Sequence, residues 1–335
     1  MNIPPSKTSP AIFRPEWLLP LGHGIHAVDT GFHREVFDAA YLIVHQGRAL
    51  FIDTGTNPSV PRLLGALEVL GLAPSSVDWV IPTHVHLDHA GGAGLLMASL
   101  PKARLMVHPR GVRHMADPSA LVAGATAVYG EAEMARSYGH IQPIDSSRID
   151  GSADGQWLDW NGRRLLFIDT PGHARHHHCI WDETSRGWFT GDTFGLSYRE
   201  FDTSRGPWLL PTTTPVQFDP QPLKASIRRM LEREPECLYL THFSRIGPDA
   251  SLVKRLGAEL IEQIDELVGM AQAVPPGTDP ARRHAALREG LAALMLRRVR
   301  ANGCTMDDAL VRSLLEIDLE LNAQGLAIWL DRETA

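Results

Sequence analysis

The segment Thr83-His84-Val85-His86-Leu87-Asp88-His89 is the most informative part of the chain, because three histidines and one aspartate lie within six residues. In an extended chain, His84 and His86 point to the same side, so one metal ion can take both imidazoles. If the chain then turns, Asp88 and His89 face a second metal ion. Three adjacent histidines have no packing reason to gather. The segment therefore predicts a metal-binding loop.

Three further polar motifs each come directly after a predicted strand, as the segment at His84 comes after the predicted strand Val77 to Pro82. A strand end followed by an exposed loop is where sites are usually built. The three motifs are Thr170-Pro171-Gly172-His173, Thr190-Gly191-Asp192 and Thr241-His242. We expect these motifs to complete the metal-binding loop.

The composition agrees with a metal site and argues against nucleic-acid binding and membrane association. Sixteen of the 335 residues are histidine, roughly twice ordinary usage, and histidine is the commonest metal ligand among side chains. The net charge of −7 leaves no basic surface for nucleic acid or an anionic membrane. No apolar run is long enough to span a membrane. The three scattered cysteines favour a reducing compartment, and we expect a cytoplasmic protein.

The sequence divides into three parts. Residues 1–20 are rich in proline and predict either an extended arm, lying on the body or on the partner of a homodimer, or a partly disordered tail. Residues 21–247 predict a mixed α/β catalytic domain, and residues 248–335 predict a helical C-terminal region. Such a chain is long enough for a sizeable core.

The expected elements follow from hydrophobic periodicity and turn residues. The predicted strands are Tyr41 to His45, Arg48 to Asp53, Val77 to Pro82, Arg104 to His108, Gln156 to Trp160, Arg163 to Asp169, His177 to Asp182, Gly187 to Thr190 and Leu238 to Thr241. The predicted helices are Leu63 to Leu70, Leu252 to Met270, Pro280 to Arg300 and Met306 to Leu319.

With these motifs in this order, the sequence resembles the metallo-β-lactamase superfamily over roughly residues 20–245, in the branch of glyoxalase II. The resemblance implies an α/β fold, an αββα four-layer sandwich with its metals at one edge between the two sheets. It implies that His84, His86 and His173 hold the first metal, that Asp88, His89 and His242 hold the second, and that Asp192 bridges both.

The implied ligand set suits hydrolytic chemistry. It contains imidazole and carboxylate but no thiolate, which fits two divalent ions; zinc is our first choice, and iron or manganese also fit. Asp88 and Asp192 cancel part of the positive charge, and the remainder favours a metal-bridging hydroxide that attacks a small-molecule carbonyl substrate. We therefore assign catalytic roles to Asp88 and Asp192.

The bridging position also indicates the subtype. The resemblance places an aspartate, Asp192, where true β-lactamases of the superfamily mostly have a cysteine, so antibiotic hydrolysis is not expected. Some lactonases have a tyrosine three residues later, where this chain has Gly195. That difference weakens a lactonase assignment, although Tyr198 lies in the same loop.

Two further residues are predicted to support the ligands. Asp53, in Ile52-Asp53-Thr54-Gly55, is expected to accept a hydrogen bond from a ligating imidazole, as carboxylates near metal sites do. The alternative is a simple turn. His177 is expected to stand next to the ligands, whereas its neighbours His176 and His178 are interpreted as surface or packing residues.

The stretch from Phe194 to Phe218 has little periodicity and follows the bridging aspartate, so it predicts either a lid beside the site or a structural wrap over the sheet. Aromatic side chains there would line an apolar pocket. The expected pocket residues are Phe194, Tyr198, Trp208 and Phe218.

Three functions remain open from the sequence. Hydrolysis of an ester, thioester or lactone is the leading hypothesis. The second is an iron-dependent oxidoreductase resembling the persulfide dioxygenases, which use a single iron. The third is a signalling or ligand-binding protein that keeps its metals, a hypothesis motivated by the helical C-terminal region.

Overall fold

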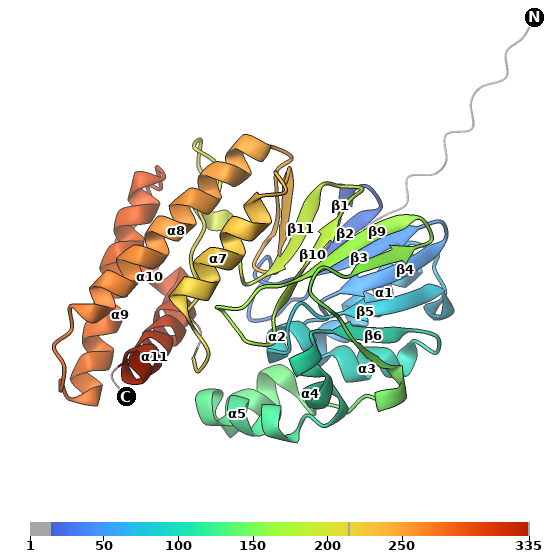
Figure 1. Cartoon of the computed structure of the whole chain (residues 1–335), viewed down its shortest axis with the longest axis horizontal. Coiled ribbons are helices and arrows are strands. Elements are labelled where there is room, and N and C mark those ends of the chain that lie inside the picture. The colour runs from blue at the N-terminus through green and yellow to red at the C-terminus, as the bar shows by residue number, and fades with distance from the viewer. Residues whose placement is uncertain (1–14, 214, 334–335) are drawn as a thin grey trace, which may run out of the picture.

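The computed structural model describes residues 15–213 and 215–333, and it has four layers (Figure 1). Two sheets lie face to face in the middle, with helices on both outer faces. The first sheet contains, in spatial order, β1 (Leu18–Gly22), β2 (Ile25–Asp29), β3 (Ala39–His45), β4 (Arg48–Ile52), β5 (Val77–Ile81), β6 (Arg104–Val107) and β7 (Ile149–Gly151). Neighbouring strands are antiparallel up to β4 and parallel from there to β7.

The second sheet runs from β13 to β8 in reverse sequence order, and only β11 and β12 pair in parallel within it. Its strands are β8 (Trp157–Trp160), β9 (Arg163–Asp169), β10 (His178–Asp182), β11 (Gly187–Gly191), β12 (Cys237–Leu240) and β13 (Ser244–Ile246). The parallel pair is significant for the site, because β11 and β12 both end at the same edge of the sandwich.

The helices fall into two groups. The first group, following strands of the first sheet, is α1 (Val60–Val69), α2 (Leu87–Ala90), α3 (Ala93–Ser99), α4 (Val112–Ala116), α5 (Ser119–Tyr129) and α6 (Glu131–Glu133), with a π-helical turn at Met134–Tyr138. The second group is α7 (Pro220–Leu231), α8 (Ala250–Gln272), α9 (Pro280–Ala301), α10 (Asp308–Leu314) and α11 (Glu316–Glu333).

Three apolar clusters correspond to the three interfaces between four layers. Tyr41 and Phe189 belong to the cluster between the two sheets. Phe51 packs with Leu63 of α1 outside the first sheet. Trp188 packs in the cluster that joins the second sheet to α7, α8 and the helices beyond. Each sheet is thus buried on both faces, which confirms the predicted α/β sandwich and helical C-terminal region.

The structure contains elements that the sequence did not predict, among them β2, β7, β13, α5 and α7, and it corrects the bounds of two segments that were predicted. Leu18 to Pro20, assigned to the arm, belong to β1; proline is tolerated there because β1 is an edge strand. Residues 1–14 of the predicted arm lie outside the described residues. The single helix predicted from Met306 to Leu319 is two helices, because Leu315 leaves the helical conformation (φ −99°, ψ 9°). Among the described residues, no helix is long and apolar enough to cross a membrane.

Candidate metal centre

The seven predicted ligands come together at one edge of the sandwich. Each lies just beyond the end of a strand: the His84 segment after β5, His173 after β9, Asp192 after β11 and His242 after β12. Their nitrogen and oxygen atoms form three overlapping groups, each with all ligand atoms within 4.8 Å of one another. These groups are His84 with His86 and His173, His84 with His89 and Asp192, and Asp88 with His89 and His242.

The first triad consists of imidazoles alone. Nε2 of His84 lies 2.9 Å from Nδ1 of His86, and Nε2 of His173 lies 3.1 Å from the same atom. Two nitrogens bound to one zinc ion at its usual Zn–N distance stand about 3.4 Å apart. The spacing of the three nitrogens is therefore close to that of a metal-binding set.

The second triad combines a carboxylate with two imidazoles. Oδ2 of Asp88 lies 3.6 Å from Nε2 of His89 and 3.6 Å from Nε2 of His242. His89 is completely buried and belongs to the short helix α2, whereas Asp88 is partly exposed to the cleft. The turn into α2 brings Asp88 and His89 to a different point from His84 and His86, as the sequence predicted.

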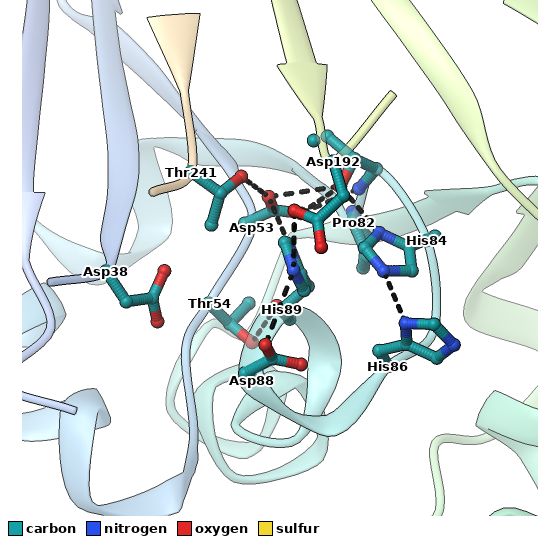
Figure 2. A network of polar contacts seen from close by, with 12 residues as sticks. Asp38, Asp53, Thr54, Pro82, His84, His86, Asp88, His89, Asp192 and Thr241 are labelled. Carbon is teal, nitrogen blue, oxygen red and sulfur yellow. Dashed lines mark hydrogen bonds and ion pairs between the residues drawn. The ribbon is translucent and has the colours of Figure 1, made fainter. Parts of the chain in front are cut away.

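Asp192 lies between the two triads, and each of its oxygens faces a different one. Oδ2 is 3.5 Å from Nε2 of His173 in the first triad. Oδ1 is 3.2 Å from Nε2 of His89 and 3.9 Å from Nε2 of His242 in the second. Figure 2 shows the Asp192 carboxylate above His89, pointing toward the ligand cluster. This is the placement that a bridging carboxylate requires.

The far nitrogens of the imidazoles are held by other groups, which aims the near nitrogens at the cluster. Nδ1 of His242 donates to the carbonyl of Phe37 at 3.2 Å. Nδ1 of His173 contacts the hydroxyl of Thr212. Nδ1 of His89 lies 3.0 Å from Oδ2 of Asp53. Such contacts fix the tautomer and the ring orientation of a ligating histidine.

Asp53 is buried and ties three strand ends together (Figure 2). Besides the contact to His89, it accepts hydrogen bonds from the backbone N–H of Thr83 at 2.7 Å and from the hydroxyl of Thr241 at 2.8 Å. Its φ of 56° is rare for a residue other than glycine. Because Thr83 follows β5 and Thr241 follows β12, one carboxylate joins both sheets directly beneath the ligands.

His177 lies behind Asp192 and His84 and is fully buried. Its Nε2 accepts a hydrogen bond from the backbone N–H of Asp192 at 3.2 Å, and its ring stacks on that of His84 with centroids 4.7 Å apart. His176 and His178 are also buried: the first lies beside His86, and the second donates to the carbonyl of Pro82 at 2.9 Å. His176 and His178 are therefore packing residues, which was one of the two interpretations from the sequence, and not surface residues.

The first triad is neutral near pH 7. Burial, together with the neighbouring imidazoles, lowers the pKa of His84 well below its ordinary range. Burial likewise lowers the pKa of His86 to about 3 and that of His173 to about 4. Neutral imidazoles keep a lone pair for a metal ion, which is the form that metal binding requires.

The second triad gathers opposite charges instead. Burial lowers the pKa of His89 and His242, but the carboxylates of Asp88 and Asp192 outweigh it, raising that of His242 to about 9. Burial raises the pKa of Asp88 and Asp192, yet the same imidazoles hold both below the ordinary range. In the second triad, the positive charge that balances the two carboxylates is carried by protonated His89 and His242. A bound metal cation would take over that role.

The donor atoms themselves fit a divalent cation. Nε2 of His89 and Oδ1 of Asp192 are buried and have no hydrogen-bond partner among the described residues, although they lie 3.2 Å apart. Buried polar atoms are rarely left unpaired, and each such case needs an explanation. A cation held between these atoms supplies it.

A cavity of about 70 Å³ opens onto the cluster. Among the four predicted pocket residues, the structure brings only Tyr198 to it. Phe194, Trp208 and Phe218 are buried in the apolar cluster between the second sheet and the helical region, where Trp208 donates to Gln263 and Phe218 faces Trp329. The segment from Phe194 to Phe218 therefore wraps over the sheet and touches the cleft only in places.

Helix α11 brings to the same cavity residues that no motif of the sequence predicted. Asp318 and Asn322 line it together with Ile317 and Leu321. Oδ1 of Asp318 accepts a hydrogen bond from the hydroxyl of Tyr198 at 3.0 Å, and burial raises the pKa of Asp318 to about 6. One feature of the sequence could have indicated these residues. Asp318 and Asn322 are polar and four residues apart, and they lie on a helix face that is otherwise apolar.

A four-layer sandwich with a buried cluster of histidine and aspartate at the strand ends defines a class of α/β proteins that bind metal at one edge. The family model of the metallo-beta-lactamase superfamily matches residues 34–242, which include all seven residues of the cluster. The chain belongs to the metallo-beta-lactamase superfamily. The family and the cluster together indicate binding of a divalent metal.

Individual relatives are distant. A metallo-beta-lactamase fold-containing protein of Sulfurisphaera tokodaii, ST1585, is 25% identical over 74% of this chain and 90% of its own length. A hydroxyacylglutathione hydrolase of Aeromonas hydrophila is 28% identical over 46% of this chain and 45% of its own length. The crystal structure of the metallo-beta-lactamase family protein TTHA1429 from Thermus thermophilus superposes with a TM-score of 0.64 at 20% identity, covering 93% of this chain and 94% of that one.

Proposed function

We propose that the protein is a dinuclear metallo-hydrolase that cleaves an ester, thioester or lactone. The observation that carries the proposal is the position of Asp192, with one oxygen facing each triad. His84, His86 and His173 would hold one ion, Asp88, His89 and His242 the other, and Asp192 both. Zinc is the ion that we propose first, since the ligands are imidazole and carboxylate.

When bound, two divalent ions supply a nucleophile at neutral pH and polarise a carbonyl oxygen. The residues of the chain prepare the site for this chemistry. Asp53 and Phe37 hold His89 and His242 in one orientation, so that the ligands need no rearrangement. Asp88 is partly exposed and lies at the open side of the cluster, where its ionised carboxylate would hold an ion and accept a hydrogen bond from an attacking water.

The surroundings support a small carbonyl substrate that has both apolar and polar groups. The cavity beside the ligands is lined by Phe32, Phe37, Leu196 and Tyr198 as well as by polar groups. The polar groups include Asp88, Asp192 and Asp318, so the cavity combines apolar walls with groups that can orient a small molecule. One relative is named hydroxyacylglutathione hydrolase, which agrees with a hydrolytic role but fixes no substrate for this chain.

The test is to measure metal content and turnover on the purified protein. We expect two divalent ions per chain by inductively coupled plasma mass spectrometry, and hydrolysis of generic aryl esters, thioesters or lactones at rates well above those of the free metal. One iron per chain with oxygen consumption would instead identify an oxidoreductase. Two ions without turnover on any of the three substrate types would favour a ligand-binding role.

A further inference from the structure

Helix α5 differs from the other long helices of the protein in how it is buried. Its sequence from Ser119 to Tyr129 is SALVAGATAVY, with no charged residue, yet none of its residues is fully buried. A helix that is apolar on all sides normally lies in a core. The apolar surface of α5 is therefore available to something other than the rest of the described chain.

One face of α5 forms the wall of a cavity of about 230 Å³. Ala120, Gly124 and Val128 line the cavity, and so does the adjacent row Leu121, Ala125 and Tyr129. Residues four apart stand above one another on a helix, so these two rows make a continuous stripe. The stripe consists of small and apolar side chains that leave the space open.

The opposite wall connects this cavity to the metal centre. His86 and Leu87 line it on that side, and Pro215 and Val216 line its rim, where Val216 is 57% exposed. His86 and Tyr129 line both this cavity and the smaller one that opens onto the ligands. A molecule lying along α5 can therefore contact His86, a member of the first triad.

The lining also defines the chemistry of the occupant. Its polar side chains are three histidines, Gln217 and Tyr129, and no aspartate, glutamate, lysine or arginine of the described chain lines the cavity. Burying an ionised group there would lack a partner, whereas removing a hydrocarbon from water is favourable. The site thus suits an uncharged chain or ring.

We propose that the cavity beneath α5, defined by the stripe and by Leu87 and Val216, binds the hydrocarbon arm of an acyl substrate whose carbonyl lies at the metal centre. The inference rests on the proposed hydrolase function and adds the substrate class. The substrates are esters or thioesters of medium-length or aromatic carboxylic acids. Short acyl groups leave the cavity empty and lose the contribution of the buried hydrocarbon.

The decisive variant is Gly124→Leu. Gly124 lines the cavity, and a Cβ atom there meets no other atom within 4 Å, so a larger side chain begins in open space. The matched control is Gly269→Leu on α8, where a Cβ also meets nothing within 4 Å and which is likewise an exposed helical glycine. Both changes replace glycine by a better helix former, so neither is expected to unfold the protein.

The experiment compares kcat/KM for acetyl, butyryl, octanoyl and benzoyl esters of one phenol. We expect the wild type and Gly269→Leu to prefer octanoyl and benzoyl esters over acetyl by roughly 10-fold or more. Gly124→Leu should lose most of that preference, because kcat/KM for the octanoyl and benzoyl esters falls toward the value for the acetyl ester. Equal rates for all esters in the wild type, or an unchanged preference in Gly124→Leu, would overturn the inference and leave the hydrolase proposal standing.

A second measurement does not depend on activity. A fluorescent fatty acid should bind the wild type and Gly269→Leu, with binding to Gly124→Leu weakened about 10-fold. If no ester is hydrolysed, the hydrolase proposal fails, and this binding result alone decides whether the cavity takes a hydrocarbon. If instead Val216→Ser dissociates a dimer and the fatty acid binds no variant, the stripe is a contact between two copies and the inference is overturned.

Discussion

The α/β body and the helical C-terminal region contribute to the same cleft in different ways. All seven candidate ligands lie in the body, at the ends of strands in a rigid sandwich. The helical region provides none of them, yet Asp318 and Asn322 of α11 line the cavity beside them. The candidate ligands and the helical residues that line the cavity beside them are therefore encoded in separate parts of the chain.

A chain of contacts joins the two regions. The amide of Asn322 accepts a hydrogen bond from the backbone N–H of Thr213 at 2.6 Å and donates to the carbonyl of Pro211 at 3.3 Å. Between these two residues stands Thr212, whose hydroxyl contacts Nδ1 of His173. Helix α11 thus holds Thr212, the residue that orients the candidate ligand His173. Variants of the body and of the helical region can each test this connection.

The largest effect is expected for a ligand of the body. His86→Ala removes one nitrogen of the first triad, and we expect metal content to fall to a small fraction and turnover to fall at least about 10²-fold. Asp192→Ala should do the same for both ions. Metal analysis after gel filtration measures this, with the exposed His140→Ala as control. Wild-type turnover with intact metal in either variant would contradict the ligand assignment.

The next effect is expected for Asp53, which touches a ligand but is not one. Asp53→Ala leaves Nδ1 of His89 and the N–H of Thr83 without their acceptor, so metal affinity should weaken by roughly 10- to 100-fold. Competition with a chelator measures it. Asp150→Ala, which removes a carboxylate paired with Arg104 in the edge strand β7, is the control. An unchanged dissociation constant would argue against the orienting role of Asp53.

The helical region is expected to show its effect in the pH dependence of stability. Burial raises the pKa of Asp318 to about 6, from an ordinary value of 3.8, and its bond to Tyr198 opposes this. The stability that the protonated carboxyl contributes is fully present below about pH 4 and is lost as the pH rises through about 6. Relative to Asp318→Asn, the wild type should lose up to a few kcal/mol over that interval.

Urea unfolding of both proteins with a chelator present measures this difference without interference from metal release. Tyr198→Phe supplies a second check, because the hydroxyl of Tyr198 lowers the pKa of Asp318. In that variant the loss should move to higher pH. A difference between wild type and Asp318→Asn that stays constant from about pH 4 to about pH 8 would show that Asp318 does not titrate in this range.

The smallest effect is expected across the junction of the two regions. Asn322→Ala removes the groups that hold Pro211 and Thr213, and metal affinity should weaken about 3-fold through the displaced Thr212. Thr212→Val should have a similar or larger effect. If α11 acts through Thr212, the double variant loses little more than Thr212→Val alone. Fully additive effects would mean that α11 does not act through this residue.

The body was predictable from the sequence because its signals are local. Each candidate ligand stands within a few residues of an apolar strand, and the hairpin at Asn161-Gly162 has the dipeptide that is typical of its turn. β1 was missed because Pro20 is unusual in a strand and is acceptable only at a sheet edge, which the sequence does not reveal. Its place depends on which strands become neighbours.

The cleft was less predictable because it depends on contacts between distant segments. Phe194 and Tyr198 are four residues apart in one irregular segment, yet only Tyr198 reaches the cavity. No periodicity distinguishes the two, since helices α8 and α11 decide which side chain is covered. Asp318 reaches the cleft from a helix more than a hundred residues further along the chain. The spacing of residues within one segment carries no information about a contact between segments so far apart in the sequence.

Asp53 accepts hydrogen bonds from Thr83 and Thr241, so this contact between the two sheets forms only after residue 241 has been synthesised. All residues of the first triad have been synthesised once the chain reaches His173. The second triad is complete only when His242 is added, after β12 near the end of the body. A nascent chain on the ribosome can therefore offer one imidazole set long before the other exists. If the protein binds two ions as proposed, the ligand set of the second is complete only after His242 has been synthesised.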